Sequence, residues 1–290
     1  MKQTTVRQFF AQFPTDEACL DHLFNVRFGQ GHSCPKCERD AKWYRLKSEQ
    51  AYSCQWCGHH IHPMVGTIFE KSRTPLQLWF YAMFLFTTSK HGVSGKELQR
   101  QLGVTYKTAW RMCAQIRKHM AEVDGDAPIG GEGEIVEVDE TFIGGYKKGA
   151  MGGKGKTVLI GMVEKDGDIV TKVIPNRSHR TVRNAVIEAV EPGSELHTDE
   201  FGAYKYMGPD YSHETVNHSQ DEYVREDGVT TNTIEGAFSH FKRSIAGTHT
   251  SISPKYLGSY AKEFEFRYNR RKCQASMLPE LLTTFPKTGV

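Results

Sequence analysis

The chain has 290 residues, of which 38% are hydrophobic and 24% are charged, and its formal net charge is +3. These values argue against an intrinsically disordered protein, because such chains combine few apolar residues with a high net charge. The longest apolar stretch, residues 78–86, is shorter than the roughly 20 residues of a membrane helix, and the N-terminus lacks the layout of a secretory signal. We therefore expect a soluble, intracellular protein with two or three domains.

The charges are distributed unevenly along the chain. Residues 1–125 carry 17 Lys and Arg against 10 Asp and Glu, a net charge of +7, whereas the remaining residues carry 20 against 24, a net charge of −4. A basic front joined to a mildly acidic back is typical of a phosphate-binding module attached to a carboxylate-bearing catalytic domain. Scattered solvated charges are the alternative interpretation.

Four cysteines near the N-terminus form two close pairs, Cys34 with Cys37 and Cys54 with Cys57, with 16 residues between the pairs. This spacing is typical of a zinc ribbon, in which two tight turns bring four thiolates around one ion and the intervening segment forms a hairpin. Because four thiolates leave no position for water, we expect one structural Zn²⁺. Two disulfides are the alternative, but they suit a secreted chain.

Two helices joined by a short turn are predicted within residues 94–120. Ser94 and Glu97 have the spacing of a capping box, and the helical pattern breaks at Gly103 and restarts after Thr105. This is the layout of a helix-turn-helix, whose second helix enters the major groove of DNA. The residues placed to reach base edges are Tyr106, Lys107, Thr108 and Arg111, and those expected near phosphates are Arg117 and Lys118. A helical hairpin within a bundle is the alternative.

The sequence pattern changes to strands after residues 125–134, an acidic, Gly-rich segment that we interpret as a linker. The predicted order is three strands, a helix and a fourth strand, at residues 134–143, 156–167, 168–176, 178–190 and 194–204. This order favours an α/β fold with a mixed sheet and flanking helices. Asp139 lies in the first strand, and Asp199 lies at the end of the fourth.

A third acid, Glu235, lies in a predicted helix, with 35 residues between it and Asp199. Lys242 follows Glu235 by seven positions, which is two helical turns, so both side chains should project from the same side of that helix. A solvated position at the end of a strand is the alternative for any single acid. We assign that interpretation to Glu140, Glu200 and Glu263.

The segments VEVDETFIGG (136–145), HTDEFGAY (197–204), NTIEGAFSHFKRSIAGTH (232–249) and EFEFRYNRR (263–271) resemble the signature blocks of bacterial insertion-sequence transposases of the DDE type. The resemblance covers nearly the whole chain and points to the ISXO-like group with an N-terminal zinc ribbon. It implies a ribonuclease-H-like fold and a cytoplasmic, nucleoid-associated bacterial protein. In some members asparagine aligns with the third acid, so Asn232 stays open beside Glu235, and the spacing favours Glu235.

The expected domains are residues 1–70 with an N-terminal helix and the zinc ribbon, 71–124 with the helix-turn-helix, the linker 125–134, and a catalytic domain at 135–290. Asp139, Asp199 and Glu235 would form a cluster of carboxylates that selects Mg²⁺ or Mn²⁺. Two such ions activate an attacking water or 3′-hydroxyl and stabilise the leaving oxygen of a phosphoryl displacement.

The predicted function is therefore a transposase that binds the terminal inverted repeats of an insertion sequence, then cuts and joins DNA strands, as a homo-oligomer. A Gly-rich segment, residues 144–157, offers Lys147 and Lys148 to DNA phosphates. Arg267, Arg270, Arg271 and Lys272 form a basic helix end that could touch DNA. The alternatives are a DNA-binding regulator with an inactive sheet domain, and a nuclease that never joins ends.

Overall fold

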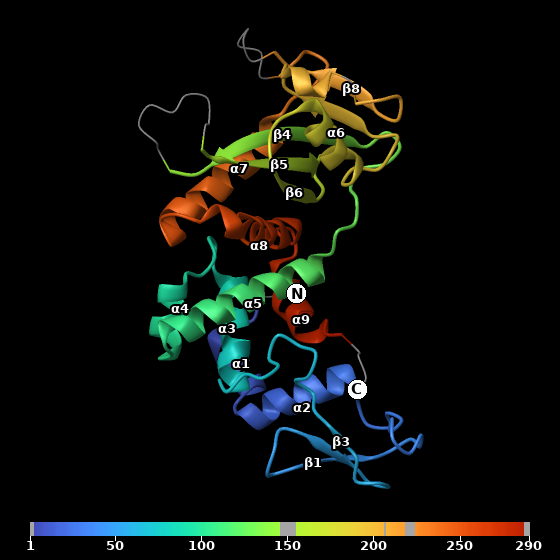
Figure 1. Ribbon diagram of the computed structural model, residues 1–290, viewed down its shortest axis with the longest axis vertical. Coiled ribbons are helices and arrows are strands. Elements are labelled where there is room, and N and C mark those ends of the chain that lie inside the picture. The colour runs from blue at the N-terminus through green and yellow to red at the C-terminus, as the bar shows by residue number, and fades with distance from the viewer. Residues whose placement is uncertain (1–2, 146–154, 206, 218–223, 287–290) are drawn as a thin grey trace. The chain divides into compact units, whose positions relative to one another are not determined.

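The computed structural model describes residues 3–145, 155–205, 207–217 and 224–286 (Figure 1). The chain divides into two compact units. The first comprises the described residues up to His119 and those from Cys273 onward, and the second runs from Met120 to Lys272. Residues 273–286 thus belong with the N-terminal part, whereas the predicted division placed them with the sheet. Within the described residues, no helix is both long and apolar enough to cross a membrane.

The first unit begins with two short helices and the predicted ribbon. Helices α1 (Val6–Gln12) and α2 (Asp16–Arg27) start after Thr5 and Thr15, whose side chains accept hydrogen bonds from the backbone of the first turn. The ribbon is a three-stranded antiparallel sheet in the order β1-β2-β3. Its strands are β1 (Trp43–Arg45), β2 (Tyr52–Cys54) and β3 (His60–Ile61).

Four further helices complete the first unit: α3 (Leu76–Thr88), α4 (Gly95–Leu102), α5 (Tyr106–Asp124), whose last turn lies in the second unit, and α9 (Met277–Thr283). Helix α3 is the apolar segment of the sequence, and it is buried among aromatic residues of α1 and the chain after it. The ring of Phe80, for example, meets that of Phe13 edge to face at 5.1 Å. Helix α9 packs against α2 and α3 because its Leu281 and Leu282 are buried there.

The second unit is built on a five-stranded sheet in the order β6-β5-β4-β7-β8. The strands are β4 (Ile135–Ile143), β5 (Thr157–Glu164), β6 (Ile169–Ile174), β7 (Glu195–Thr198) and β8 (Ser212–Thr215). The first three pair antiparallel as a meander, whereas β7 pairs parallel to β4 and β8 parallel to β7. The predicted mixed sheet with flanking helices is confirmed.

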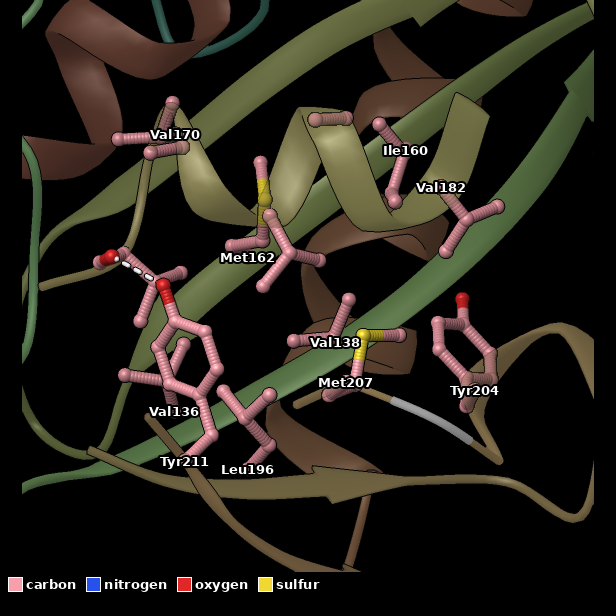
Figure 2. Packing of buried hydrophobic residues seen from close by; sticks show 14 of the residues in the cluster. Val136, Val138, Ile160, Met162, Val170, Val182, Leu196, Tyr204, Met207 and Tyr211 are labelled. Carbon is pink, nitrogen blue, oxygen red and sulfur yellow. Dashed lines mark hydrogen bonds between the residues drawn. The ribbon is translucent and has the colours of Figure 1, made fainter. Parts of the chain in front are cut away.

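Helices cover both faces of this sheet. They are α6 (His179–Ile187), α7 (Asn232–Ser244) and α8 (Leu257–Asn269), with short helical turns at Gly202–Tyr204, Ile245–His249, Pro254–Tyr256 and, in the first unit, Gln274–Ser276. On one face, Val136 and Val138 of β4 pack with Ile160 and Met162 of β5 against Val182 of α6 (Figure 2). On the other face, alternate strand residues pack against α7 and α8. This alternation divides the residues of β4 between two cores.

The segment predicted as a linker is docked on the second unit. Ile129 is buried, and its backbone exchanges hydrogen bonds with the residues around Val190, with which it forms a bridge. The amide of Gly131 donates to Oγ of Ser194 at 2.9 Å. The predicted linker is therefore held in place by hydrogen bonds to residues 189–194, and hydrophobic periodicity does not reveal such bonds.

Candidate functional site

Asp139 and Asp199 lie near each other in the fold because β4 and β7 are parallel neighbours. Their register pairs Ile135 with Glu195 and Glu137 with His197. Continued by two residues, the same register places Asp139 beside Asp199, which follows the last residue of β7. Neighbouring strands lie about 4.8 Å apart and paired residues share a face, so both carboxylates emerge at one edge of the sheet on one side.

Helix α7 brings Glu235 to the same side of the sheet. Glu235 lies in its first turn, and the following residues Ala237, Phe238 and Phe241 pack on the sheet with Ile234. The helix lies close to β5 because Gly161 presents no side chain there. A Cβ at Gly161 would lie 2.7 Å from Cδ1 of Ile234. Gly161 is the antiparallel partner of Asp139, so the close packing occurs beside the first aspartate.

The pKa of Asp139 is affected by burial and by the charges of the neighbouring acids. Burial is the largest of the causes that raise the pKa of Asp139 to about 7, followed by the charge of the adjacent Glu140, and the smaller effects of Asp199 and Glu235 act in the same direction. The amide of Glu140 opposes this rise by donating to Oδ1 of Asp139 at 2.7 Å. Because burial and, after it, the neighbouring carboxylates bring the pKa of Asp139 near neutral pH, a divalent cation bound beside it would favour its ionised form.

The other predicted residues of the cluster lie in different surroundings. Asp199 accepts a hydrogen bond from the amide of Phe201 at 3.0 Å, which fixes the turn after β7. Glu235 accepts from Oγ1 of Thr231 at 3.1 Å. Asn232 and Lys242 are exposed on α7, at its first residue and in its last turn. The charge that reaches Asp139 from this helix is that of Glu235.

Glu140 is not the solvated acid that the sequence predicted. Its side chain is 3% exposed, and Oε1 forms an ion pair with Nη1 of Arg177 at 2.7 Å. Oε2 accepts a hydrogen bond from the hydroxyl of Tyr204. The guanidinium of Arg177 lies over the rings of Phe142 and Phe201, 4.8 and 4.4 Å from their centroids. The prediction failed because Glu140 faces the opposite core to Asp139, where these partners lie.

Tyr204 belongs to the same environment. Burial, followed by the charge of Glu140 and their hydrogen bond, raises the pKa of Tyr204 well above its usual value, and the charges of Asp139 and Asp199 act in the same direction. Tyr204 therefore stays protonated and donates to Glu140. Glu263, also predicted to be solvated, is 1% exposed and paired with Arg267, so that prediction is wrong as well.

A buried acid that the sequence did not single out, Glu137, lies two residues before Asp139 on the same face of β4. Its carboxylate accepts hydrogen bonds from the first turn of α7. Burial raises its pKa, which these hydrogen bonds and the neighbouring His197 oppose. The alternation of β4 could have placed Glu137 beside Asp139, but only the fold reveals its partner.

The four ribbon cysteines converge as predicted. Their sulfur atoms all lie within 4.8 Å of one another, and the Sγ atoms of Cys34 and Cys57 are 3.6 Å apart and those of Cys37 and Cys54 3.9 Å apart. Four sulfurs at about 2.3 Å from a tetrahedral Zn²⁺ would be about 3.8 Å from one another. The donor set therefore fits a closed structural zinc site, with no position for a substrate.

The helix pair α4 and α5 leaves most of the predicted DNA-binding residues accessible. Helix α4 ends at Gly103, whose left-handed backbone has φ 66°, and α5 begins three residues later. Tyr106 is 46% exposed and Lys107 is exposed, whereas Thr108 is half-buried. Arg111 is also exposed, and its guanidinium donates to the carbonyl of Glu70 at 3.3 Å.

The four other basic residues predicted near DNA phosphates differ in outcome. Arg117 is wrongly predicted near phosphates, because it is 4% exposed, donates to the carbonyl of Val93 at 3.2 Å and lies over the ring of Phe86. Lys118 is exposed. Lys147 and Lys148 lie outside the described residues.

The basic end of α8 is used inside its own unit. Its contacts run from Arg267 to Glu263, from Arg270 to Asp124, from Arg271 to the carbonyl of Gly167 and from Lys272 to the carbonyl of Asp166. Arg270 and Arg271 also lie over the rings of Phe266 and Tyr268. These partners satisfy the basic groups, so their predicted contact with DNA has no support from their surroundings.

Two models of known protein families match separate parts of the chain. Residues 130–269 match the family model described as ISXO2-like transposase domain, and residues 14–60 match the one described as transposase zinc-ribbon domain. The first range contains Asp139, Asp199 and Glu235, and the second contains all four ribbon cysteines.

A curated protein of Halobacterium salinarum (strain ATCC 700922 / JCM 11081 / NRC-1) is similar over most of the length. It is described as "Uncharacterized protein in transposable element ISH50" and is 25% identical over 277 residues, which cover 88% of this chain and 91% of the relative. The similarity therefore extends through both units.

Proposed function

We propose that this chain, which belongs to the insertion-sequence transposases with an ISXO2-like transposase domain and a transposase zinc ribbon, binds the terminal inverted repeats of its element and cuts and joins DNA strands there. The observation that supports the catalytic part is that the charges of Asp199, which follows β7, and of Glu235 on α7 both act on Asp139 of β4 and raise its pKa. The strand order, a three-stranded meander continued by two parallel strands, supports the ribonuclease-H-like fold.

The three carboxylates would hold two divalent cations, Mg²⁺ or Mn²⁺. Their oxygens are the ligands that these cations prefer, and the raised pKa of Asp139 fits a site built for positive charge. Ions bound there would activate a water or 3′-hydroxyl and stabilise the leaving oxygen. Asp139 would supply a ligand from β4, Asp199 from the position directly after β7, and Glu235 from the first turn of α7. Glu235 is favoured over Asn232, whose side chain is exposed.

The DNA-binding part of the proposal assigns α4 and α5 as a helix-turn-helix. The exposed residues at the start of α5, Tyr106, Lys107 and Arg111, would enter the major groove, with Thr108 beside them. Lys147 and Lys148 would contact phosphates from the Gly-rich segment. Two copies or more would bridge the two ends of the element as a homo-oligomer.

One assay tests the proposed chemistry. The protein is incubated with DNA that carries the element ends, Mg²⁺ and a target plasmid, and the strands are separated on a denaturing gel. A transposase gives cleavage with strand transfer, whereas a nuclease gives cleavage alone and a DNA-binding regulator gives neither. Either of the last two results would contradict the proposal.

Variants of the acids sharpen the assay. Asp139→Asn, Asp199→Asn and Glu235→Gln should each lower cleavage by a factor of about 10³ or more, since each removes a charged ligand. Glu200→Gln is the matched control, because Glu200 is an exposed acid next to Asp199 and should leave cleavage unchanged. Asn232→Ala decides the third ligand. A loss equal to that of Glu235→Gln would return the role to Asn232.

A further inference from the structure

The carboxylate of Glu137 joins strand β4 to the start of helix α7. Its Oε2 accepts from the amides of Thr233 and Ile234 at 2.8 and 3.0 Å, and its Oε1 accepts from the hydroxyl of Thr233 at 2.8 Å. These residues are separated by 96 and 97 positions in the chain. Glu137 is 1% exposed, so the bonds form where water does not compete for them.

Helix α7 needs this carboxylate because its own N-cap provides no side-chain bond. Thr231 holds the N-cap position, and its side chain does not cap the helix. The first amide, that of Asn232, donates to Oγ1 of Thr230. The next two donate to Glu137, and a negative charge at this end also interacts favourably with the helix dipole. The helix therefore starts where β4 holds it.

Two of the candidate ligands, Asp139 and Glu235, are close in sequence to the residues that form these hydrogen bonds. Asp139 follows Glu137 by two residues on the same face of β4, and Glu235 follows Thr233 by two residues in the first turn of α7. A change in the Glu137 contacts would therefore move Glu235 relative to Asp139. Gly161 has no side chain, so α7 can lie close enough to the sheet for Thr233 to bond Glu137 and for Glu235 to approach Asp139.

The neighbouring strand holds the chain before α7 in a similar way. His197 is the register partner of Glu137, and its Nδ1 accepts from the amide of Thr230 at 3.5 Å. Its Nε2 lies 2.9 Å from Oε1 of Glu195, which favours the tautomer protonated on Nε2 and leaves Nδ1 as the acceptor. Asp199 follows His197 by two residues. Each strand aspartate is thus preceded by a side chain that holds the segment carrying Glu235.

We propose that Glu137 is a positioning residue for the carboxylate cluster: its three hydrogen bonds to Thr233 and Ile234 fix Glu235 against Asp139 and so prepare the set to bind divalent cations. Glu137 acts through the helix and does not itself coordinate the ion. The inference rests on the proposed function, because it explains the hydrogen bonds of Glu137 by their effect on that same carboxylate cluster. A merely structural role would affect the stability of α7 but not the affinity of the folded protein for the cation.

The experiment measures binding of Mn²⁺ alone to the full-length, zinc-loaded protein by isothermal titration calorimetry, well below its melting temperature. Asp139→Asn provides the baseline for binding elsewhere. Glu137→Leu keeps the volume but removes both acceptor oxygens, and we expect it to weaken Mn²⁺ binding by about 10-fold to 100-fold. Glu137→Gln can accept both amides through its carbonyl and donate to the hydroxyl of Thr233, so it should remain within about threefold of the wild type.

The outcomes separate the two roles. Unchanged Mn²⁺ affinity in a folded Glu137→Leu protein would overturn the inference, as would a loss in Glu137→Gln equal to that in Glu137→Leu. If Glu137→Leu does not fold, Glu137→Asp decides, because it keeps the charge and withdraws the carboxylate by one methylene. An affinity several-fold weaker supports the positioning role, and an unchanged affinity refutes it.

Failure of the proposed function gives a different result. If the wild-type protein binds no more Mn²⁺ than Asp139→Asn, the carboxylate cluster is not a cation site and both proposals fall together. If the wild type binds Mn²⁺ through Asp139 and the Glu137 variants bind equally well, only the positioning role falls. Amide hydrogen exchange at Thr233 and Ile234 shows independently whether each variant has released the helix start.

Discussion

Gly161 of β5 lies opposite Asp139 of β4 in the antiparallel register, and the face of Gly161 is covered by α7. A side chain at this position would meet Cδ1 of Ile234 at 2.7 Å and Cζ of Phe238 at 2.9 Å. The absence of a Cβ is thus what allows the helix that carries Glu235 to pack beside the first aspartate.

Gly161→Ala should therefore displace α7. We expect the free energy of unfolding to fall by about 1–3 kcal/mol, because overpacking a buried contact forces side chains and backbone to shift. Chemical denaturation measures the effect. Gly236→Ala is the control on the same helix: nothing lies within 4 Å of a Cβ there, so alanine should increase stability by about 0.5–1 kcal/mol through its helix propensity. Equal effects of the two substitutions would contradict the close packing.

The raised pKa of Asp139 predicts a pH dependence of stability in protein without added divalent cations. An unfolded aspartate has a pKa of about 3.9, whereas burial and the neighbouring Glu140 raise the pKa of Asp139 to about 7 in the fold. Between these values the folded state binds a proton that the unfolded state has lost, so stability falls as pH rises from about 4 to about 7 and levels off above that. The loss is at most about 4 kcal/mol.

Denaturation of the wild type and Asp139→Asn at pH 5 and pH 8 measures this contribution. Asparagine does not titrate, so the variant should lose less stability than the wild type between the two pH values. An equal loss in both proteins would show that Asp139 has an ordinary pKa. Added Mn²⁺ should reduce the wild-type loss, because a bound cation favours the ionised carboxylate.

The elements of the second unit were largely predictable because their signals are local. The apolar runs around Val138 and Ile160 have strand patterns, and the turn at Asp166 and Gly167 separates two of the strands. The strand that carries Asp139 and the helix that carries Glu235 occur where the sequence placed them. The ribbon was predictable from cysteine spacing alone.

What the sequence did not reveal depends on partners that are distant along the chain. Glu137 and Glu140 are only three positions apart in the sequence, yet Glu140 contacts Arg177 and Glu137 contacts Thr233. Period-two alternation places them on opposite faces but says nothing of what covers each face. In the same way, charge alone could not distinguish Arg117, which is buried, from exposed Lys118. Burial of a charged group is decided by its tertiary partners.

Removal of one ribbon cysteine should release zinc. Cys57→Ser leaves three thiolates, and we expect the zinc content to fall from one ion per chain to well below that, with loss of structure in β1 to β3. Zinc is measured by atomic absorption after dialysis, and the ribbon by its amide exchange. Cys273→Ser is the matched control, because Cys273 is exposed and lies outside the cluster. Full zinc retention in Cys57→Ser would contradict the four-thiolate site.

Arg177→Ala should destabilise the second unit by leaving the buried carboxylate of Glu140 without its cation. We expect a loss of about 1–3 kcal/mol, below the value for a fully buried pair because the side chain of Arg177 is 35% exposed. Lys172→Ala provides the comparison. It removes an ion pair to Glu188, whose side chain is 68% exposed, and should cost less than about 1 kcal/mol. A smaller loss in Arg177→Ala than in Lys172→Ala would be incompatible with the environment of Glu140.

Lys107 tests the assignment of α5 as the helix that contacts DNA. The residue is exposed in the first turn, and an ammonium that neutralises one phosphate releases condensed counterions. Because Lys107 is placed to reach base edges, Lys107→Ala should weaken binding to an end-repeat duplex by about 1–3 kcal/mol more than binding to unrelated DNA, and should leave the slope of log K against log salt nearly unchanged. Fluorescence anisotropy across a salt series measures both quantities.

Lys165→Ala is the control, because Lys165 is an exposed lysine of the β5–β6 turn in the other unit. The salt dependence of DNA binding by this variant should match that of the wild type. If instead Lys107→Ala weakens binding to both DNAs by similar factors and reduces the slope by about 1, Lys107 contacts a phosphate and its assignment to base edges is wrong. No change in either quantity would show that Lys107 does not contact DNA.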